Sequence, residues 1–207
     1  MPRTTQQFLE IEEIKEGIVI LKNKTFRKIL VVSSLNFSLK SVEEQDAIIY
    51  QYQNFLNSLD FSLQIIIQSR KINLTGYLEK LKKMEIKQQN MLLRDQIEKY
   101  QEFIKNLITK NSILSKNFFV VIPFTSSEIP EIKTSQQKKA SLEEERFERI
   151  KSQIWQRAEF VILGLKRCGL ECTPLNSYEL IELFWSLYHP EQAEQGYYPS
   201  FPPELIK

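Results

Sequence analysis

The sequence is short of the residues that most often build catalytic and metal sites. Its 207 residues include one histidine, two cysteines and five glycines. One histidine and two cysteines cannot supply the four ligands of a structural zinc site without help from carboxylates. The glycines stand singly, so the chain has no glycine-rich loop of the kind that holds phosphate groups. These shortages argue against an enzyme.

Long hydrophobic runs are missing as well. The longest, residues 118–122 and 160–163, are far shorter than the roughly 20 residues that cross a bilayer. The first seven residues lack the apolar core of a signal peptide. We therefore expect a cytoplasmic protein, whose only membrane association would be peripheral, at the inner face. Cys168 and Cys172 are then expected to be reduced and structural, since their spacing is not the C-x-x-C of a redox pair.

What the sequence does contain is typical of a soluble globular protein. Hydrophobic side chains make up 42% of it and charged side chains 26%, which is enough for a real core in one or two domains. Lys and Arg number 28 against 26 Asp and Glu. Such nearly equal numbers of basic and acidic residues do not by themselves indicate binding to nucleic acid or membranes.

The first third of the chain predicts strands and one helix. Short runs rich in Ile and Val are separated by two pairs that favour turns, Glu16-Gly17 and Asn23-Lys24, which indicates an antiparallel β-meander. A capping box, Ser41-x-x-Glu44, then begins a helix. The strand that follows the helix contains Ile65, Ile66 and Ile67 and is expected to be buried. The predicted strands are 8–15, 18–22, 26–35 and 61–69, and the helix is 41–59.

The middle of the chain, residues 74–111, predicts helix. Apolar residues recur there at steps of three and four, in a stripe that Gln88 and Gln89 weaken. One long helix or two with a break near these glutamines fit the pattern. A continuous helix would be about 55 Å long, so it would project or pack as an antiparallel pair. The alternatives are a helix that covers the sheet and a helix that projects for contact with a partner.

The last part of the chain continues the mixed pattern. Residues 115–124 predict a strand closed by Pro123, and Ser141-x-x-Glu144 resembles a capping box for a long helix. Residues 172–175 predict a short edge strand, and Asn176 with Glu179 a further capped helix that stops before Pro190. The tail, residues 196–203, reads as an extended segment. The stripe of the long helix is Phe147, Ile150, Ile154, Ala158, Val161 and Leu165.

Together these patterns predict an α+β fold. We expect an antiparallel sheet that begins with the β-meander and is packed by several helices, one of them the long central helix or helical hairpin. The N-terminal α/β part comprises residues 1–124, and residues 125–139 form an exposed loop or linker. Residues 140–207 are the C-terminal, helical part of the same domain.

Arrangements that could carry chemistry are incomplete. Gly164 and Gly169 have the glycine spacing of a P-loop, but Leu170 and Glu171 stand where Lys and Ser or Thr are needed. His189, the sole histidine, is placed at a helix end, where an imidazole meets exposed carbonyls. The acidic pairs are expected at strand edges and in first helical turns. We predict no catalytic residue, cofactor or metal site, and a hydrolase built on the histidine or clustered acids is the alternative. The acidic groups are 12–13, 43–44 and 143–145.

Charge is distributed unevenly along the chain. Residues 71–110 carry nine Lys or Arg and five Asp or Glu, whereas residues 171–207 carry one Lys and six Glu. The basic stretch is either a solvated helical face or a surface for phosphates or an anionic membrane. A nucleic-acid-binding module is therefore the second hypothesis of function. The possible interaction surface consists of Lys80, Lys82, Lys83, Lys87 and Arg94.

Core and turn patterns over nearly the whole chain resemble a known family. The segments that carry the resemblance are 13–22, 30–37, 55–61, 119–123, 163–169 and 188–190. They are similar to the TraC-like family, the N-terminal domain of the large ATPases that energise conjugative type IV secretion, a domain that does not bind nucleotide.

The resemblance implies a function through protein contacts. In the family an ATPase domain with its P-loop follows this domain, whereas this sequence ends at Lys207. No catalytic residue carries over, because none of the matching positions belongs to a nucleotide site. The expected protein is a platform that docks the secretion motor to inner-membrane components, or onto a separately encoded ATPase. No small-molecule substrate is expected.

Overall fold

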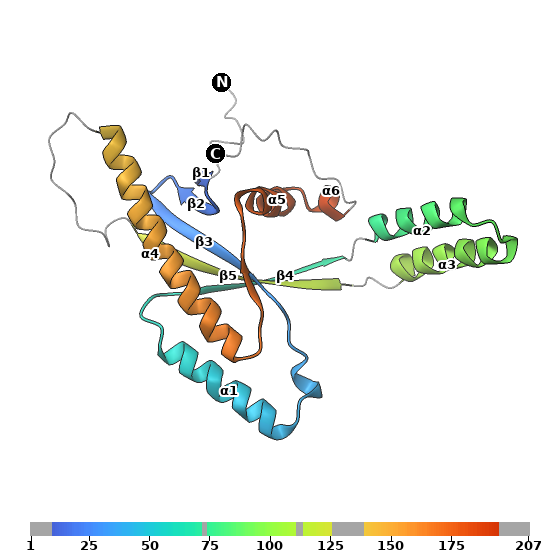
Figure 1. Cartoon of the computed structure of the whole chain (residues 1–207), viewed down its shortest axis with the longest axis horizontal. Helices are drawn as coiled ribbons and strands as arrows, with labels where there is room; N and C mark the ends of the chain where they lie inside the picture. The colour runs from blue at the N-terminus through green and yellow to red at the C-terminus, as the bar shows by residue number, and fades with distance from the viewer. Residues whose placement is uncertain (1–9, 72–73, 111–113, 126–138, 195–207) are drawn as a thin grey trace. The chain divides into compact units, whose positions relative to one another are not determined.

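The computed structural model describes residues 10–71, 74–110, 114–125 and 139–194, and it confirms the α+β fold (Figure 1). The described residues divide into two compact units. The first holds the residues up to Ile67 and those from Asn117 to Ile181, and the second holds Gln68–Lys116 and the residues from Glu182 onward. The strands are β1 (Ile11–Lys15), β2 (Ile18–Leu21), β3 (Thr25–Val32), β4 (Gln64–Lys71), β5 (Leu114–Thr125) and β6 (Cys172–Pro174). The helices are the 3-10 helix η2 (Phe37–Leu39), α1 (Val42–Asn57), α2 (Thr75–Lys87), α3 (Met91–Lys110), α4 (Lys139–Arg167), α5 (Ser177–Tyr188) and α6 (Pro190–Glu194).

The predicted β-meander is confirmed. β1, β2 and β3 pair antiparallel in sequence order. Glu16 and Gly17 form the two-residue turn between β1 and β2, with φ angles of 50° and 71°. Positive φ at both positions is the type I′ geometry that matches the twist of a hairpin, and glycine accepts it without strain. The turn therefore sets the register in which Lys15 pairs with Ile18.

The sheet is completed by strands from later in the chain. Its order is β1-β2-β3-β5-β4, and β6 pairs with β3 beyond the reach of β2. β3 and β5 pair without interruption from Thr25 opposite Thr125 to Val32 opposite Phe118. Pro123 lies inside this ladder, so the prediction that it closes the strand is wrong. The predicted edge strand at residues 172–175 is confirmed as β6.

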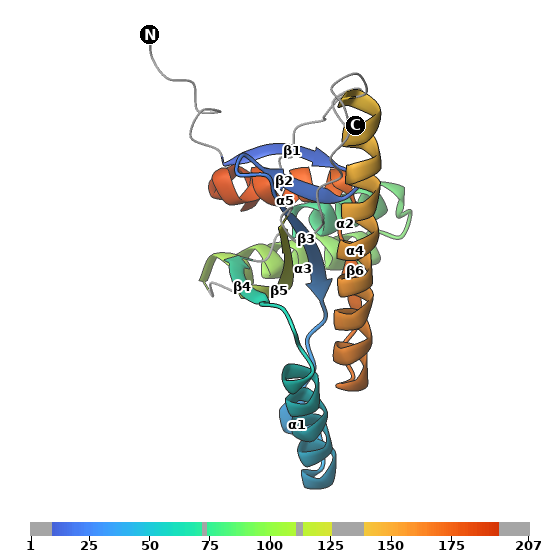
Figure 2. The same ribbon diagram turned by 90° about the vertical axis from the view of Figure 1, so that its left-hand side faces the viewer.

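One face of these strands is covered by α4 (Figure 2). The predicted stripe of six apolar residues, from Phe147 to Leu165, is buried along its whole length and packs against Leu30, Val120 and Ile122. The helix begins at Lys139, two residues before Ser141, so the predicted capping box does not mark its start. It ends in a Schellman motif, in which Gly169 adopts a φ of +81° and the amide of Leu170 donates to the carbonyl of Leu165.

Helix α1 packs on the C-terminal part of α4. Its predicted capping box is confirmed: the Ser41 side chain accepts from the Glu44 amide and the Glu44 carboxylate accepts from the Ser41 amide. Phe55 is the buried residue of α1, and its ring lies against Gly164 of α4. A side chain at Gly164 would occupy the space of that ring, so this glycine allows the two helices to approach closely.

Strand β4 is the main departure from the predicted core. The isoleucines at its start were expected to be buried, but Ile65 is 54% exposed and Ile67 is 61% exposed. The reason is position: β4 is the last strand in the sheet order, and the apolar residues that pack on the core are those just before it, Phe61 and Leu63. A run of isoleucines alone does not distinguish a central strand from an edge strand.

The second unit contains a helical hairpin. Of the two alternatives left open by the sequence, the structure has two helices with a break near Gln88 and Gln89, since α2 ends at Lys87 and α3 begins at Met91. The hydroxyl of Tyr77 donates to that of Tyr100, and Gln101 donates to the carboxylate of Glu85. Tyr77 at the start of α2 thus contacts the middle of α3, whereas Glu85 near the end of α2 also lies 3.8 Å from Arg94 at the start of α3, so the helices are antiparallel. The predicted linker at 125–139 lies almost wholly outside the described residues, and the predicted tail at 196–203 lies outside them entirely.

Replacing Gly164 with alanine is expected to destabilise the protein. The added Cβ would lie 2.2 Å from Cδ2 of Phe55, and the net cost after the gain in helix propensity should be about 1–2 kcal/mol. Gly76→Ala is the matched control, because a Cβ at this position of α2 meets nothing within 4 Å. It should leave stability unchanged or raise it by up to about 1 kcal/mol. Urea denaturation of both variants measures the difference, and equal effects would contradict the α1–α4 contact.

Candidate docking site

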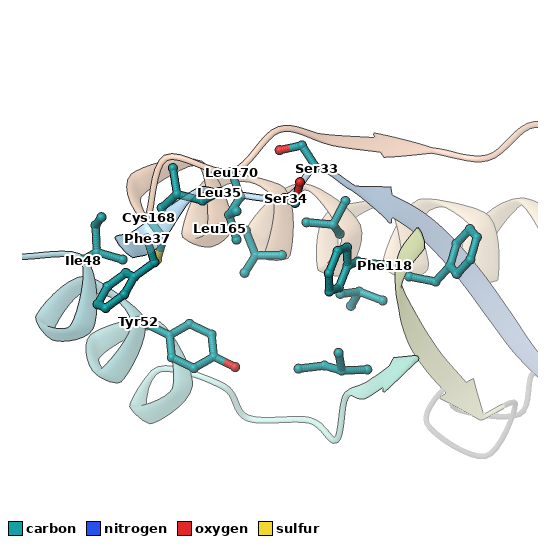
Figure 3. Close-up of a pocket in the computed structure, with 14 residues that line it drawn as sticks. Ser33, Ser34, Leu35, Phe37, Ile48, Tyr52, Phe118, Leu165, Cys168 and Leu170 are labelled. Atoms are coloured by element: carbon teal, nitrogen blue, oxygen red, sulfur yellow. The ribbon is translucent and has the colours of Figure 1, made fainter. Parts of the chain in front are cut away.

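The first unit contains an apolar pocket of about 360 Å³. Figure 3 shows its walls: Ile48 and Tyr52 of α1 face Phe118 of β5 across the hollow, with Leu165 of α4 between them. Fourteen residues line the pocket, and none of them is charged. They are Val32, Ser33, Ser34, Leu35, Phe37, Ile48, Tyr52, Ile65, Phe118, Phe119, Val120, Leu165, Cys168 and Leu170.

The pocket lies where the helices do not fully cover the sheet, at the end of β3. β3 ends at Val32, and the chain then leaves the sheet through Ser33 and Ser34 toward η2 and α1. Ser33 holds this exit in place, because its amide donates to the carbonyl of Glu171 and its hydroxyl accepts from the Glu171 amide. α1 packs on α4 at Phe55, two turns beyond Ile48, so the start of α1 leaves the ends of β3 and β5 uncovered.

The chemistry of the pocket suits apolar side chains. Its polar groups are two serine hydroxyls, the phenol of Tyr52 and the thiol of Cys168. Burial raises the pKa of the Cys168 thiol, so the sulfur stays protonated at neutral pH and is a poor nucleophile. Burial also raises the pKa of Cys172 to about 11. Both cysteines are free, as predicted. A volume of this size accommodates one or two large side chains or a small apolar ligand.

Sequence patterns did not reveal this pocket. Ile48 and Tyr52 belong to the apolar residues that recur at helical spacing in α1, and both are only partly buried. Helical periodicity identifies the apolar face of a helix but not whether a neighbour covers it. A weak signal was present in Leu35 and Phe37, two large apolar residues in a segment between a strand and a helix, where polar residues are usual.

The five predicted interaction residues lie together on the hairpin of the second unit. Lys80, Lys83 and Lys87 share the face of α2 that points away from α3, and Lys82 is on its flank. Arg94 is in the first turn of α3, and its Nε atom lies 3.8 Å from a carboxylate oxygen of Glu85. All five are exposed. The structure therefore brings the basic residues together, in a unit of the chain that does not contain the pocket.

Several of the other chemical groups weighed in the sequence have structural partners. His189 ends α5 as predicted, with its ring stacked on Trp185 at 4.8 Å and its Nδ1 atom 3.1 Å from the Trp185 carbonyl oxygen. Glu12 binds Lys24, and Glu44 completes the cap of α1. Among the described residues no three His, Cys, Asp or Glu side chains come together as metal ligands. In the same part of the chain, no helix has both the length and the hydrophobicity needed to cross a bilayer.

Lys28 of β3 is a buried cation that sequence patterns did not single out. Its ammonium group donates to the carbonyl oxygens of Gly17 at 2.7 Å and Leu175 at 3.0 Å, and lies 4.4 Å from the centre of the Trp155 ring. Burial lowers the pKa of the amine from 10.5 to about 8, although the carboxylate of Glu179 opposes the shift. The side chain joins the β1–β2 turn to the segment before α5.

The stability of the protein should rise between about pH 8 and pH 10.5 because of Lys28. In this range the unfolded chain holds a proton on Lys28 that the folded chain has released, so folding is favoured as the proton concentration falls. The gain in the free energy of unfolding approaches about 3 kcal/mol for the full difference between the pKa values of Lys28 in the folded and the unfolded chain. Lys28→Met should lose this pH dependence, whereas the half-exposed control Lys40→Met should keep it. Urea denaturation at several pH values compares them, and parallel curves for all three proteins would contradict the assignment.

Comparison with known proteins supports the resemblance noted in the sequence. The family model of the archaeal TraC-like domain matches residues 12–190. No curated protein and no solved structure matches the chain. The matched range takes in the described sheet except the first residue of β1, together with the helical hairpin and the pocket. The chain therefore belongs to the archaeal TraC-like domain family.

Proposed function

We propose that this protein is a non-enzymatic docking component of a conjugative type IV secretion apparatus. In this proposal it connects the motor ATPase with inner-membrane subunits through protein contacts. The observation that carries the proposal is the uncharged apolar pocket of the first unit, which offers buried contact area and no reactive group. Membership of the TraC-like family supports the association with secretion.

The positions of the glycines support a role without nucleotide chemistry. A P-loop places its glycines before a helix, so that amide groups at the helix N-terminus surround the phosphates. Gly164 instead lies within α4, and Gly169 terminates the same helix. The C-terminal end of a helix presents carbonyl oxygens, which repel phosphate. Neither glycine is therefore placed to hold a nucleotide.

The second hypothesis, a nucleic-acid-binding module, has less support. The hairpin that carries Lys80, Lys83 and Lys87 also exposes large apolar side chains, which contribute nothing to contacts with phosphates. One of the five predicted interaction residues, Arg94, is already close to a carboxylate. We retain DNA binding as an outcome that the tests below can detect.

Filling the pocket should abolish docking. Ser34 is exposed and lines the pocket, so Ser34→Trp places an indole in the hollow without removing a core contact. Ser38→Trp is the matched control, because Ser38 is exposed in η2 and does not line the pocket. We expect a tagged wild-type chain and Ser38→Trp to retain the secretion ATPase or inner-membrane secretion subunits from host cells. The amount of these subunits that Ser34→Trp retains should be about tenfold lower.

Two results would contradict the proposal. Retention of these subunits by Ser34→Trp at the level of the control would show that the pocket is not the docking site. Hydrolysis of ATP by the purified chain, abolished by a substitution of its own residues, would show an enzyme instead. Binding to DNA that falls with salt and with charge reversal at Lys83 would favour the second hypothesis.

A further inference from the structure

The hairpin of the second unit ends in a cluster of exposed apolar side chains. We define the hairpin tip as residues 84–94, the last turn of α2, the link and the first turn of α3. Met91 is 87% exposed and Leu92 is 77% exposed, values that are extreme for large apolar residues. Singly exposed apolar residues are common, but five within eleven positions are a patch. The five are Met84, Ile86, Met91, Leu92 and Leu93.

The apolar tip is surrounded by positive charge. The five predicted interaction residues, from Lys80 to Arg94, lie on the tip or within one turn of it, and Glu85 is the single acidic residue in that span. Glu85 is already engaged, since its carboxylate accepts from Gln101 at 2.9 Å and lies near Arg94. The surface that remains for a partner is therefore apolar at its centre and basic around it.

In the link between the two helices, polar side chains accept hydrogen bonds from nearby backbone amides. The side-chain oxygen of Gln88 accepts from the amide of Asn90 at 3.2 Å, and the side-chain oxygen of Asn90 accepts from the amide of Leu92 at 3.0 Å. Asn90 thereby caps α3. Moving an amide group out of water costs less free energy when the group already has a hydrogen-bond partner within the chain. The turn can thus enter a less polar environment together with Met91 and Leu92.

We propose that the hairpin tip binds the surface of an anionic lipid bilayer. Exposed apolar side chains reach the boundary between headgroups and acyl chains, about 5–10 Å deep, while Lys and Arg bind the phosphates of the headgroups. Long basic side chains suit this arrangement, since their stems follow apolar surface while the charge stays at the headgroup level. The helices themselves do not cross the membrane in this proposal.

Other binding partners would match either the basic or the apolar residues of the hairpin tip, but not both. A nucleic acid would use the basic residues and leave Met91 and Leu92 in water. A second copy of the hairpin tip would cover the apolar residues but would bring two sets of five basic side chains together, which is unfavourable. An anionic lipid surface satisfies both parts. This inference goes beyond the docking function and does not depend on it, because the pocket belongs to the other unit.

Vesicle binding tests the apolar part of the proposal. The full chain is sedimented with vesicles of phosphatidylcholine alone or with about one quarter phosphatidylglycerol, at about 0.1 M salt. We expect binding to the anionic vesicles, and a loss of about tenfold for Leu92→Asp. Leu39→Asp is the matched control, since Leu39 is 80% exposed but lies in η2 of the first unit. Circular dichroism confirms that each variant is folded.

Charge reversal tests the basic part. Lys83→Glu should weaken binding to the anionic vesicles by about tenfold, whereas Lys116→Glu, the same change on the exposed β5 residue of the same unit, should have little effect. Absence of binding to anionic vesicles, or binding by Leu92→Asp equal to that of its control, would overturn the proposal. The proposal would also be overturned if the protein left the vesicles and bound DNA when both are present. Ser34→Trp should bind vesicles like the wild type, so failure of the docking function and failure of this proposal are distinguishable.

Discussion

The burial of one stripe of α4 against the sheet determines the arrangement of the first unit. The stripe begins near β1, where Lys15 lies over the ring of Phe147 at 4.6 Å. It continues past Trp155, which covers the ammonium group of Lys28, and reaches α1 where Gly164 meets Phe55. One helix therefore contacts the meander, the central strands and α1 in turn. The strands hold one another through the sheet ladders, and α4 holds the sheet to α1.

The pocket follows from how this helix ends. The Schellman motif at Gly169 turns the chain back, and Cys172 to Pro174 then pair with β3 as β6. Leu165, Cys168 and Leu170 remain at the end of the stripe with no helix opposite them but the first turns of α1. Because α1 contacts α4 mainly through Phe55, its start diverges from the sheet. The hollow is a consequence of two helices that meet at one end only.

The sequence predicted the elements well because their signals are local. The turn at Glu16-Gly17, the cap at Ser41 and the stripe of α4 each depend on residues a few positions apart, and all three were correct in type. The break in the central helix was also local, since Gln88 and Gln89 interrupt the apolar period.

Two local signals failed, the capping box at Ser141 and the strand end at Pro123, but the larger failures depended on contacts between distant segments. The exposure of Ile65 to Ile67 follows from the place of β4 at the sheet edge, which the residues themselves do not encode. The pocket depends on the angle between α1 and α4, and the burial of Lys28 on carbonyl groups that are up to 147 positions away. Only the basic residues of the candidate sites could be named in advance, because charge is visible without the fold.

The two surfaces proposed for binding differ in chemistry in a way that suits a connecting component. The pocket is concave and has no charged residue in its lining, so it discriminates by shape and by burial of apolar groups. The hairpin tip exposes its apolar side chains and is basic, so it is attracted to any anionic surface over several ångströms and needs little shape complementarity. A selective contact with a protein and a tolerant contact with a membrane place different demands on a surface, and one patch could not meet both. The two surfaces lie in different units, so a substitution in one surface does not change the residues of the other.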